Sequence, residues 1–167
     1  RGRTVFVGDI AVTERPDAEE MANIAVALAA KARQMGHTPR VAILSFTNFG
    51  NPESRTSVEA RRTVEILQSR DVGFEFDGEM TGDIALDYDL MKSRYPFCNL
   101  TGPANILVMP GLHSANISFK LVDQLGNVSV IGPIMIGGAH PFQIVQMGAS
   151  VSDIVQTAVL AAHDAIR

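Results

Sequence analysis

The sequence predicts an α/β fold in which helices cover both faces of a mostly parallel sheet. Five short apolar runs alternate with five segments whose apolar residues recur at helical spacing, and glycine or proline stands at most of the joints. Such alternation is typical of βαβ units with right-handed crossovers. We therefore expect a three-layer α/β/α sandwich, in which ligands bind outside the carboxyl ends of the strands.

The N-terminal elements are marked by their end signals. The first expected strand, Thr4–Val7, is a short β-branched and aromatic run. Asp17 then begins a helix, because Glu20 stands three positions later as in a capping box. Apolar residues follow at helical spacing as far as Gly36, a residue type that commonly ends helices. The next strand is Val41–Phe46, whose apolar run suits a strand buried on both faces.

The middle and the end of the chain continue the alternation, with proline or glycine at many boundaries. Asparagine followed by proline is a typical helix start, because proline suits the first turn. The expected elements are a helix from Asn51-Pro52 to about Arg70, a strand at Phe74–Phe76, a helix from Thr81 to about Lys92, a loop over residues 95–103, a strand at Asn105–Met109, a helix at Ser114–Leu125 ended by Gly126, a strand at Val128–Ile131, a loop at Gly132–Pro141 and a last helix opened by Ser150.

Composition excludes several classes of function. The chain has 167 residues, 46% of them hydrophobic and 19% charged, which is typical of one globular unit and not of a disordered chain. A net charge of −4 makes nucleic acids and anionic membranes poor partners. Cys98 is the single cysteine, so no internal disulfide forms, and a cytoplasmic setting is the simplest. The start at Arg1, without an initiator methionine, suggests a domain excised from a longer protein.

Three loops are expected at the ligand side of the sheet. Residues 47–51, 110–116 and 132–138 follow predicted strands and are rich in glycine and amide side chains. Exposed backbone amides and helix N-termini suit an anion such as phosphate, although ordinary capped turns would look the same. Neither G-x-G-x-x-G nor G-x-x-x-x-G-K-[ST] is present. The sequence therefore does not indicate that this chain itself binds NAD(P) or hydrolyses ATP.

Other reactive side chains have plain interpretations. An acidic run could suit a hard cation, but its spacing is not that of a calcium loop, and we expect a solvated acidic face. The run consists of Asp77, Glu79, Asp83, Asp87 and Asp89. Among the histidines, His37 and His163 are expected to be structural, whereas His113 and His140 lie on ligand-side loops. Cys98 has no nearby base, so we expect a buried or idle thiol.

A series of motifs in the second half is distinctive. They are Tyr-Pro-Phe at 95–97, Leu-Thr-Gly-Pro-Ala-Asn-Ile-Leu-Val-Met-Pro at 100–110, Ser-Ala-Asn-Ile-Ser-Phe-Lys at 114–120 and Ile-Gly-Pro-Ile at 131–134, with Asp-Gly-Glu at 77–79 and Leu-Ser-Phe at 44–46. Together they resemble the phosphate acetyltransferase (phosphotransacetylase) family. The resemblance covers essentially all of residues 1–167, as the C-terminal half of the family's catalytic unit, and implies an isocitrate/isopropylmalate dehydrogenase-like sandwich.

Two further runs, Arg-Thr-Val-Phe-Val at 3–7 and Ser-Phe-Thr-Asn-Phe-Gly at 45–50, resemble the C-terminal domain of bacterial NADP-dependent malic enzymes. This resemblance implies a domain that senses acetyl-CoA and regulates an attached malic-enzyme domain, which converts malate to pyruvate. It also implies NADP and a divalent metal (Mg or Mn) in that other domain, no cofactor in this chain and a homo-oligomeric assembly. Nucleic acid and membrane partners are not implied.

The decisive departure from the family lies before the last helix. Active members carry Ser-Arg-Gly-x-Ser-x-x-Asp, whose arginine and aspartate serve the CoA thiol and the acetyl group. Here Gly148, Ser150 and Asp153 match, but Gln146 replaces the serine and Met147 replaces the arginine. Methionine cannot balance a negative charge. Loss of one such donor typically costs about 100- to 1,000-fold in rate, so the resemblance implies a domain that is not itself catalytic.

The same comparison implies the ligand cleft. Active members tend to carry Thr-Lys-Gly-Ser where this chain has residues 48–51, so a phosphate-attracting lysine is missing. The residues implied for an acetyl-CoA or phosphate cleft are Ser45, Asn48, Gly50, Asn51, Asn116, Lys120, Gly132, Gln146, Met147, Ser150 and Asp153. Ser150 and Asp153 are equally explained as a helix cap, and Lys120 as a surface lysine. An active phosphate acetyltransferase and a mainly structural role in oligomerisation remain as alternatives.

Overall fold

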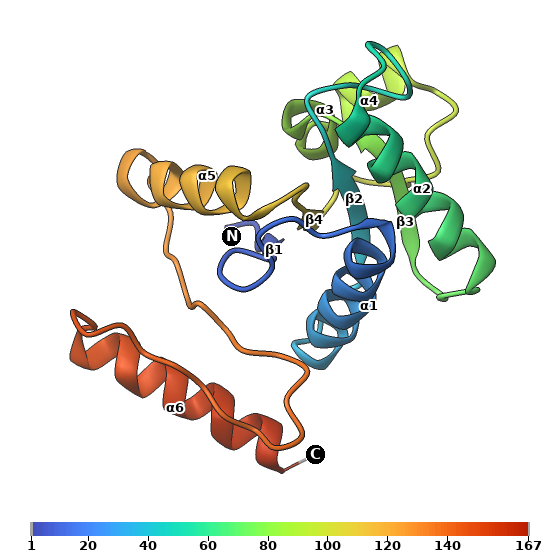
Figure 1. Ribbon diagram of the computed structural model, residues 1–167. Helices are drawn as coiled ribbons and strands as arrows, with labels where there is room; N and C mark the ends of the chain where they lie inside the picture. Colours follow the sequence, from blue (N-terminus) through green and yellow to red (C-terminus); the bar gives the residue numbers. More distant parts are fainter. Residues whose placement is uncertain (1, 167) are drawn as a thin grey trace. The chain divides into compact units, whose positions relative to one another are not determined.

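Four parallel strands form one sheet in the computed structural model, which describes residues 2–166 (Figure 1). The strands are β1 (Phe6–Gly8), β2 (Arg40–Leu44), β3 (Glu75–Met80) and β4 (Ile106–Val108), in the spatial order β1-β4-β2-β3. All three pairings are parallel. The predicted α/β class with a mostly parallel sheet is confirmed. The chain divides into two compact units, residues 1–119 and residues 120–167, and each is described by itself.

Helices cover both faces of this sheet in the first unit. Helices α1 (Ala18–Gln34) and α2 (Arg55–Ser69) pack against each other and against the strands. On the other face, Ala42 and Leu44 join a buried cluster with residues of α3 (Gly82–Leu86) and α4 (Tyr88–Arg94). Because side chains alternate along a strand, the neighbours of Ala42 and Leu44 in β2 point toward α1 and α2.

The buried cluster beneath α3 and α4 is apolar and continuous. Its members share exposures below one tenth and are Ala42, Leu44, Met80, Ile84, Ala85, Met91, Cys98, Leu100, Ala104, Leu107, Met109 and Ala115. Burial of such side chains contributes about 25 cal/mol per Å² of apolar surface. This cluster fixes the positions of the ends of β2, β3 and β4, where the site lies.

The sequence signals predicted the start of α1 correctly, but they predicted the start of α2 three residues too early. Asp17 accepts a hydrogen bond from the amide of Glu20, and the Glu20 carboxylate accepts one from the amide of Asp17, so the predicted capping box is confirmed. The helix expected from Asn51-Pro52 instead begins after Ser54, whose hydroxyl accepts from the amide of Ser57. The prediction was wrong because Asn51 pairs with Asn48 in a bridge that turns the chain before the helix.

Four other expected elements differ in their bounds. The helix expected over Thr81 to Lys92 is two short helices, because Asp87 caps α4 through the amide of Leu90. The strand expected at Phe74–Phe76 begins at Glu75 and extends to Met80. Strand β1 begins two residues later than expected, at Phe6, and β4 occupies the centre of the expected run.

The second unit contains the end of α5 (Leu112–Leu125) and α6 (Val151–Ala165). No residue of α6 is buried, and apolar side chains such as Val155 and Val159 are more than half exposed. The strand expected at Val128–Ile131 does not form, because this segment makes no ladder with the four strands of residues 2–166. Among the described residues, no helix has the length and apolar character that a membrane span requires.

Candidate functional site

A cavity of about 650 Å³ lies in the first unit where β2 and β4 end. Ligand pockets typically measure about 300–1,000 Å³, so this volume suits an organic ligand. The lining residues come from the loops after these strands, from the loop before α1, and from the starts of α2, α3 and α5. They are Glu14, Arg15, Leu44, Ser45, Phe46, Thr56, Gly82, Met109, Pro110, Gly111, His113, Ser114 and Ser118. The cavity therefore occupies the position at which parallel sheets bind ligands.

One of the three expected ligand loops, residues 110–116, contributes to the cavity wall, and no residue of the expected loop 47–51 does. Ser45 lines it from the end of β2, and the segment from Pro110 to Ser114 lines it from the end of β4. His113, one of the two candidate histidines, is among the lining residues. Asn116, which was expected to contact ligand, does not line the cavity, and its side-chain amide donates to the carbonyl oxygen of Ile10 at 3.3 Å.

The rest of the loop after β2 turns away from the cavity toward β3. The side-chain oxygen of Asn48 accepts hydrogen bonds from the amide and the hydroxyl of Thr81, at 2.9 and 3.2 Å. The backbone amide of Gly50 donates to Oε1 of Glu79 at 2.8 Å. Asn51 pairs with Asn48 through the backbone. These three predicted ligand residues therefore shape the loop and do not line this cavity.

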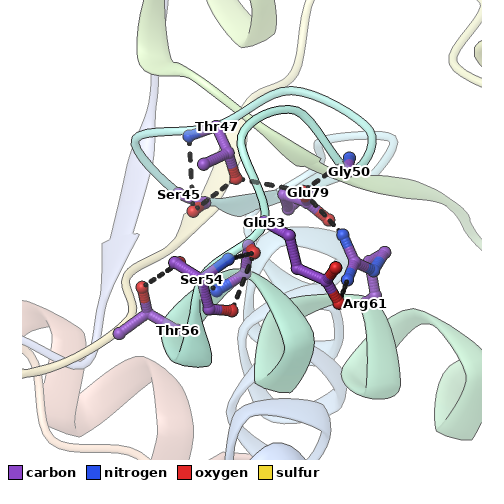
Figure 2. Close-up of polar contacts among 9 residues, drawn as sticks. Ser45, Thr47, Gly50, Glu53, Ser54, Thr56, Arg61 and Glu79 are labelled. Atoms are coloured by element: carbon purple, nitrogen blue, oxygen red, sulfur yellow. Dashed lines mark hydrogen bonds and ion pairs between the residues drawn. The ribbon is translucent and has the colours of Figure 1, made fainter.

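Glu79 is the centre of a polar network beside the cavity (Figure 2). Its side chain is fully buried at the end of β3. Besides the Gly50 amide, Oε1 accepts from the hydroxyl of Thr47 at 3.0 Å and from Nη1 of Arg61 at 3.4 Å. Arg61 also pairs with the exposed Glu53 at 3.4 Å. One carboxylate thus joins β3, the loop after β2 and helix α2.

The network reaches the cavity wall through the hydroxyl of Ser45. Oγ1 of Thr47 lies 3.0 Å from Oγ of Ser45, and Ser45 lines the cavity. The amide of Thr47 also donates to Oγ of Ser45 at 3.4 Å. At the start of α2, the hydroxyl of Ser54 lies 3.1 Å from that of Thr56, a second hydroxyl on the cavity wall.

The expected solvated acidic face is wrong for two of its five members. Asp77 is 6% exposed and Glu79 is completely buried. The two oxygens of Asp77 accept from the amides of Gly78 and Asn99, at 2.9 and 2.7 Å. Hydrogen bonds to buried oxygens therefore stabilise these carboxylates inside the fold, and most of the donors lie far away in the sequence. No group of three or more residues within 2–166 has the side chains and geometry to hold a metal ion.

Several predicted ligand residues lie in the second unit. Lys120 is exposed, Gly132 is in an extended loop, and Met147 is fully exposed, with Gln146 exposed beside it. Ser150 and Asp153 form the capping box of α6, as the alternative interpretation expected. Hydrogen bonds from the Ser150 hydroxyl and amide hold the pKa of the Asp153 carboxyl below its ordinary value.

The remaining reactive side chains lie outside the cavity wall. The ring of His37 packs edge-on against Phe6 at 5.5 Å, and Nδ1 of His163 lies 3.7 Å from the carboxylate of Asp164. His140 is exposed in the second unit. Cys98 is buried, as expected, and burial raises the pKa of its thiol to about 11.

Sequence reasoning missed Thr47, Arg61 and Glu79 as parts of one network. Thr47 lay in an expected ligand loop and Glu79 in the Asp-Gly-Glu motif, but neither was singled out as a site residue. No local signal marked Glu79 as buried, because its partners Thr47 and Arg61 lie 32 and 18 residues away in the sequence. Arg61 carried no sequence signal, because surface arginines on helices are common.

Comparison with known families matches residues 1–162 to the family model described as phosphate acetyl/butaryl transferase. This chain belongs to the phosphate acetyl/butaryl transferase family. The match covers nearly the whole chain and includes the loops that line the cavity as well as the Gln146-Met147 segment. The family resemblance inferred from the sequence motifs is therefore confirmed.

Curated relatives include members of two kinds. The chain is 48% identical to an NADP-dependent malic enzyme of Rhizobium meliloti (strain 1021), over 99% of this chain and 22% of that enzyme. It is 36% identical to a phosphate acetyltransferase of Paracoccus denitrificans, over 97% of this chain and 51% of that enzyme. The chain thus spans about a fifth of the length of the malic enzyme and about half that of the acetyltransferase.

Solved structures agree with the family. The EutD phosphotransacetylase from Staphylococcus aureus matches with a TM-score of 0.91 and 29% identity, over 99% of this chain and 52% of that chain. A phosphotransacetylase from Streptococcus pyogenes matches with a TM-score of 0.90 and 32% identity, over 96% of this chain and 49% of that chain. The sandwich with a parallel sheet is therefore the fold of this family.

Proposed function

We propose that this chain is the phosphotransacetylase-like, C-terminal domain of an NADP-dependent malic enzyme, and that it binds acetyl-CoA as a regulator without transferring its acetyl group. The observation that carries the proposal is the 48% identity to a malic enzyme of which this chain would form only 22%. In this proposal the parent, a cytoplasmic enzyme, converts malate to pyruvate in its other domain, where NADP and a divalent metal (Mg or Mn) bind.

Two substitutions support a role without catalysis. Gln146 and Met147 stand where active members of the family carry serine and arginine. A thioether supplies neither charge nor a hydrogen-bond donor for phosphate or for a developing oxyanion. A domain that keeps its cavity but lacks these groups is suited to hold an acyl-CoA without turning it over.

The cavity supports acyl-CoA as the ligand. Its volume of about 650 Å³ accommodates part of a CoA-sized molecule, and both hydroxyl groups and apolar side chains line it. Binding that favours one state of the attached enzyme by about 1–3 kcal/mol would change malate turnover several-fold or more. This coupling requires no chemistry in the cavity.

Calorimetric titration of the whole parent enzyme with acetyl-CoA tests the proposal, with malate oxidation followed as NADPH absorbance. We expect saturable heat and a change in malate oxidation over the same acetyl-CoA range. Ser118→Phe should weaken binding by at least about tenfold, because Ser118 is an exposed residue of the cavity wall. Ile117→Phe is the matched control, since the exposed Ile117 does not line the cavity. Absence of both heat and a kinetic effect would refute the proposal.

A second candidate is an active phosphate acetyltransferase. Gly148, Ser150 and Asp153 keep the pattern of active members, and one relative is named a phosphate acetyltransferase. An assay for CoA release and acetyl phosphate formation separates the two functions. Turnover at ordinary enzyme rates, about 1–1,000 per second, would favour the second candidate.

A role in assembly is compatible with either function. The exposed apolar side chains of α6 support a surface that pairs with another protein segment, and we propose a homo-oligomer. Sizing of the parent enzyme with and without residues 1–167 tests this part, and an unchanged size would contradict it.

A further inference from the structure

The hydroxyl of Ser45 belongs to a chain of hydrogen bonds whose direction is fixed. Three donors converge on Oε1 of the buried Glu79: the Gly50 amide, Arg61 and the hydroxyl of Thr47. This oxygen therefore acts as an acceptor toward Thr47. A hydroxyl group carries one proton, and Thr47 gives it to Glu79.

The direction of the next hydrogen bond follows from this. Oγ1 of Thr47 lies 3.0 Å from Oγ of Ser45, and Thr47 has no second proton to offer. Ser45 must therefore donate its own proton to Thr47, away from the cavity. Its oxygen already accepts from the Thr47 amide at 3.4 Å, which leaves one lone pair for a ligand.

This inference rests on the proposed function. We propose that Ser45 is a specificity-determining residue that presents a hydrogen-bond acceptor to the cavity. Thr47 and Glu79 are the positioning residues, because they fix the direction of the Ser45 hydroxyl. The matching ligand group is an N–H donor of the acyl-CoA. The amides of the pantetheine arm and the adenine amine both have this chemistry. A phosphate oxygen does not, because two acceptors would face each other at this point.

The hydroxyl direction distinguishes this wall from an anion site. A serine that is free to rotate can donate to phosphate, as hydroxyl groups near helix N-termini commonly do. Here the proton is committed to a buried partner, and Thr47 itself is only 1% exposed. Ser45 therefore selects for a hydrogen-bond donor at this point of the cavity wall.

Binding measurements on the whole parent enzyme test the consequence. Ser45→Ala and Thr47→Val should each weaken acetyl-CoA binding by about 3- to 10-fold, the value of one hydrogen bond. Thr47→Ser, which keeps the hydroxyl, should restore the wild-type affinity. Inorganic phosphate should bind Thr47→Val more tightly than wild type, because Ser45 is then free to donate. Ser93→Ala removes a hydroxyl that only contacts the carbonyl of Leu90 and controls for the loss of a hydroxyl.

Two further arms complete the test. Pantetheine in place of acetyl-CoA locates the N–H donor of the ligand. If Ser45→Ala also weakens pantetheine binding, the donor lies in the pantetheine arm. If Ser45→Ala leaves pantetheine binding unchanged, the donor is the adenine amine. Neutron diffraction of the deuterium-exchanged full chain shows the Ser45 deuteron directly, and we expect it to point at Thr47. A deuteron pointing into the cavity, or unchanged acetyl-CoA affinity in Ser45→Ala and Thr47→Val, overturns the inference. If the wild type binds no acetyl-CoA, the proposed function fails, and the deuteron position alone decides the hydroxyl direction.

Discussion

The carboxylate of Glu79, at the end of β3, accepts a 2.8 Å hydrogen bond from the backbone amide of Gly50, which lies 29 residues earlier in the chain. Oε2 of the same carboxylate is buried and has no hydrogen-bond partner within residues 2–166. All the side-chain hydrogen bonds of Glu79 within residues 2–166 therefore act through Oε1. This single oxygen holds the loop that carries Ser45 and Thr47, together with the hydrogen bonds from Thr81 to Asn48.

Replacement of Glu79 by alanine should destabilise the fold strongly. Glu79→Ala leaves the buried Thr47 hydroxyl and the Gly50 amide without their acceptor, so we expect a loss of about 2–4 kcal/mol in the free energy of unfolding. Urea denaturation measures this loss. Glu53→Ala is a matched control, because Glu53 pairs with the same Arg61 but its side chain is 73% exposed. The control should cost less than about 1 kcal/mol, and equal costs for the two variants would contradict the role of burial.

Glycine is required at position 78 by close approach of the neighbouring strand. A Cβ added there would lie 2.7 Å from the carbonyl oxygen and 2.9 Å from the Cβ of Ile43, in β2, and Gly78 has a φ of +155°. Gly78→Ala should therefore lower the free energy of unfolding by about 2–4 kcal/mol, as strained or overpacked sites do. Thermal unfolding checks the loss.

Gly82→Ala provides the control for this substitution. An added Cβ at Gly82 meets no atom within 4 Å, and the residue lies at the start of α3. Alanine is the better helix former, so we expect no loss, or a gain of up to about 1 kcal/mol. A Gly78→Ala protein as stable as Gly82→Ala would show that β2 and β3 can separate without cost.

Local chemistry made part of this fold predictable. The capping boxes at Asp17 and at Ser150 were predictable because each consists of residues three positions apart. Strand β2 was also recognisable from adjacent residues, because a strand buried on both faces is a continuous apolar run without polar alternation. The position of the cavity followed from the order of strands and helices alone.

The network around Glu79 was not predictable in this way. Thr47 and Arg61 lie 32 and 18 residues from Glu79 in sequence, so its burial depends on contacts that no local pattern encodes. An acidic residue without visible partners is normally exposed, which is why Asp77 and Glu79 were assigned to a solvated face. The prediction of a strand at Val128–Ile131 was wrong for a different reason. A strand-like run forms a strand only where a neighbouring sheet edge is available for pairing.

The buried Cys98 thiol should react slowly with alkylating reagents. Burial raises its pKa from 9.0 to about 11, so at pH 8 the thiolate fraction is about 100-fold smaller than in the unfolded chain. Iodoacetamide labelling followed by mass spectrometry should show at least this difference between the native chain and the chain in urea. The raised pKa also stabilises the fold below about pH 9, and this contribution is lost as the pH rises toward 11. Rapid labelling of the native chain at pH 8 would contradict the assigned burial.

The pH dependence of α6 should follow Asp153. Hydrogen bonds from Ser150 lower the pKa of this carboxyl, so its contribution to the helix is present above the ordinary aspartate pKa and is lost as the pH falls through the lowered value. Ser150→Ala removes the hydroxyl donor and should raise the Asp153 pKa toward its ordinary value, as read from a carbon NMR titration of the carboxyl. Ser152→Ala is the matched control, because the Ser152 hydroxyl contacts Gln156 and not Asp153. Identical Asp153 titrations in wild type and Ser150→Ala would mean that the side-chain half of this capping box does not form in solution, and that the backbone amide of Ser150 alone holds the carboxylate.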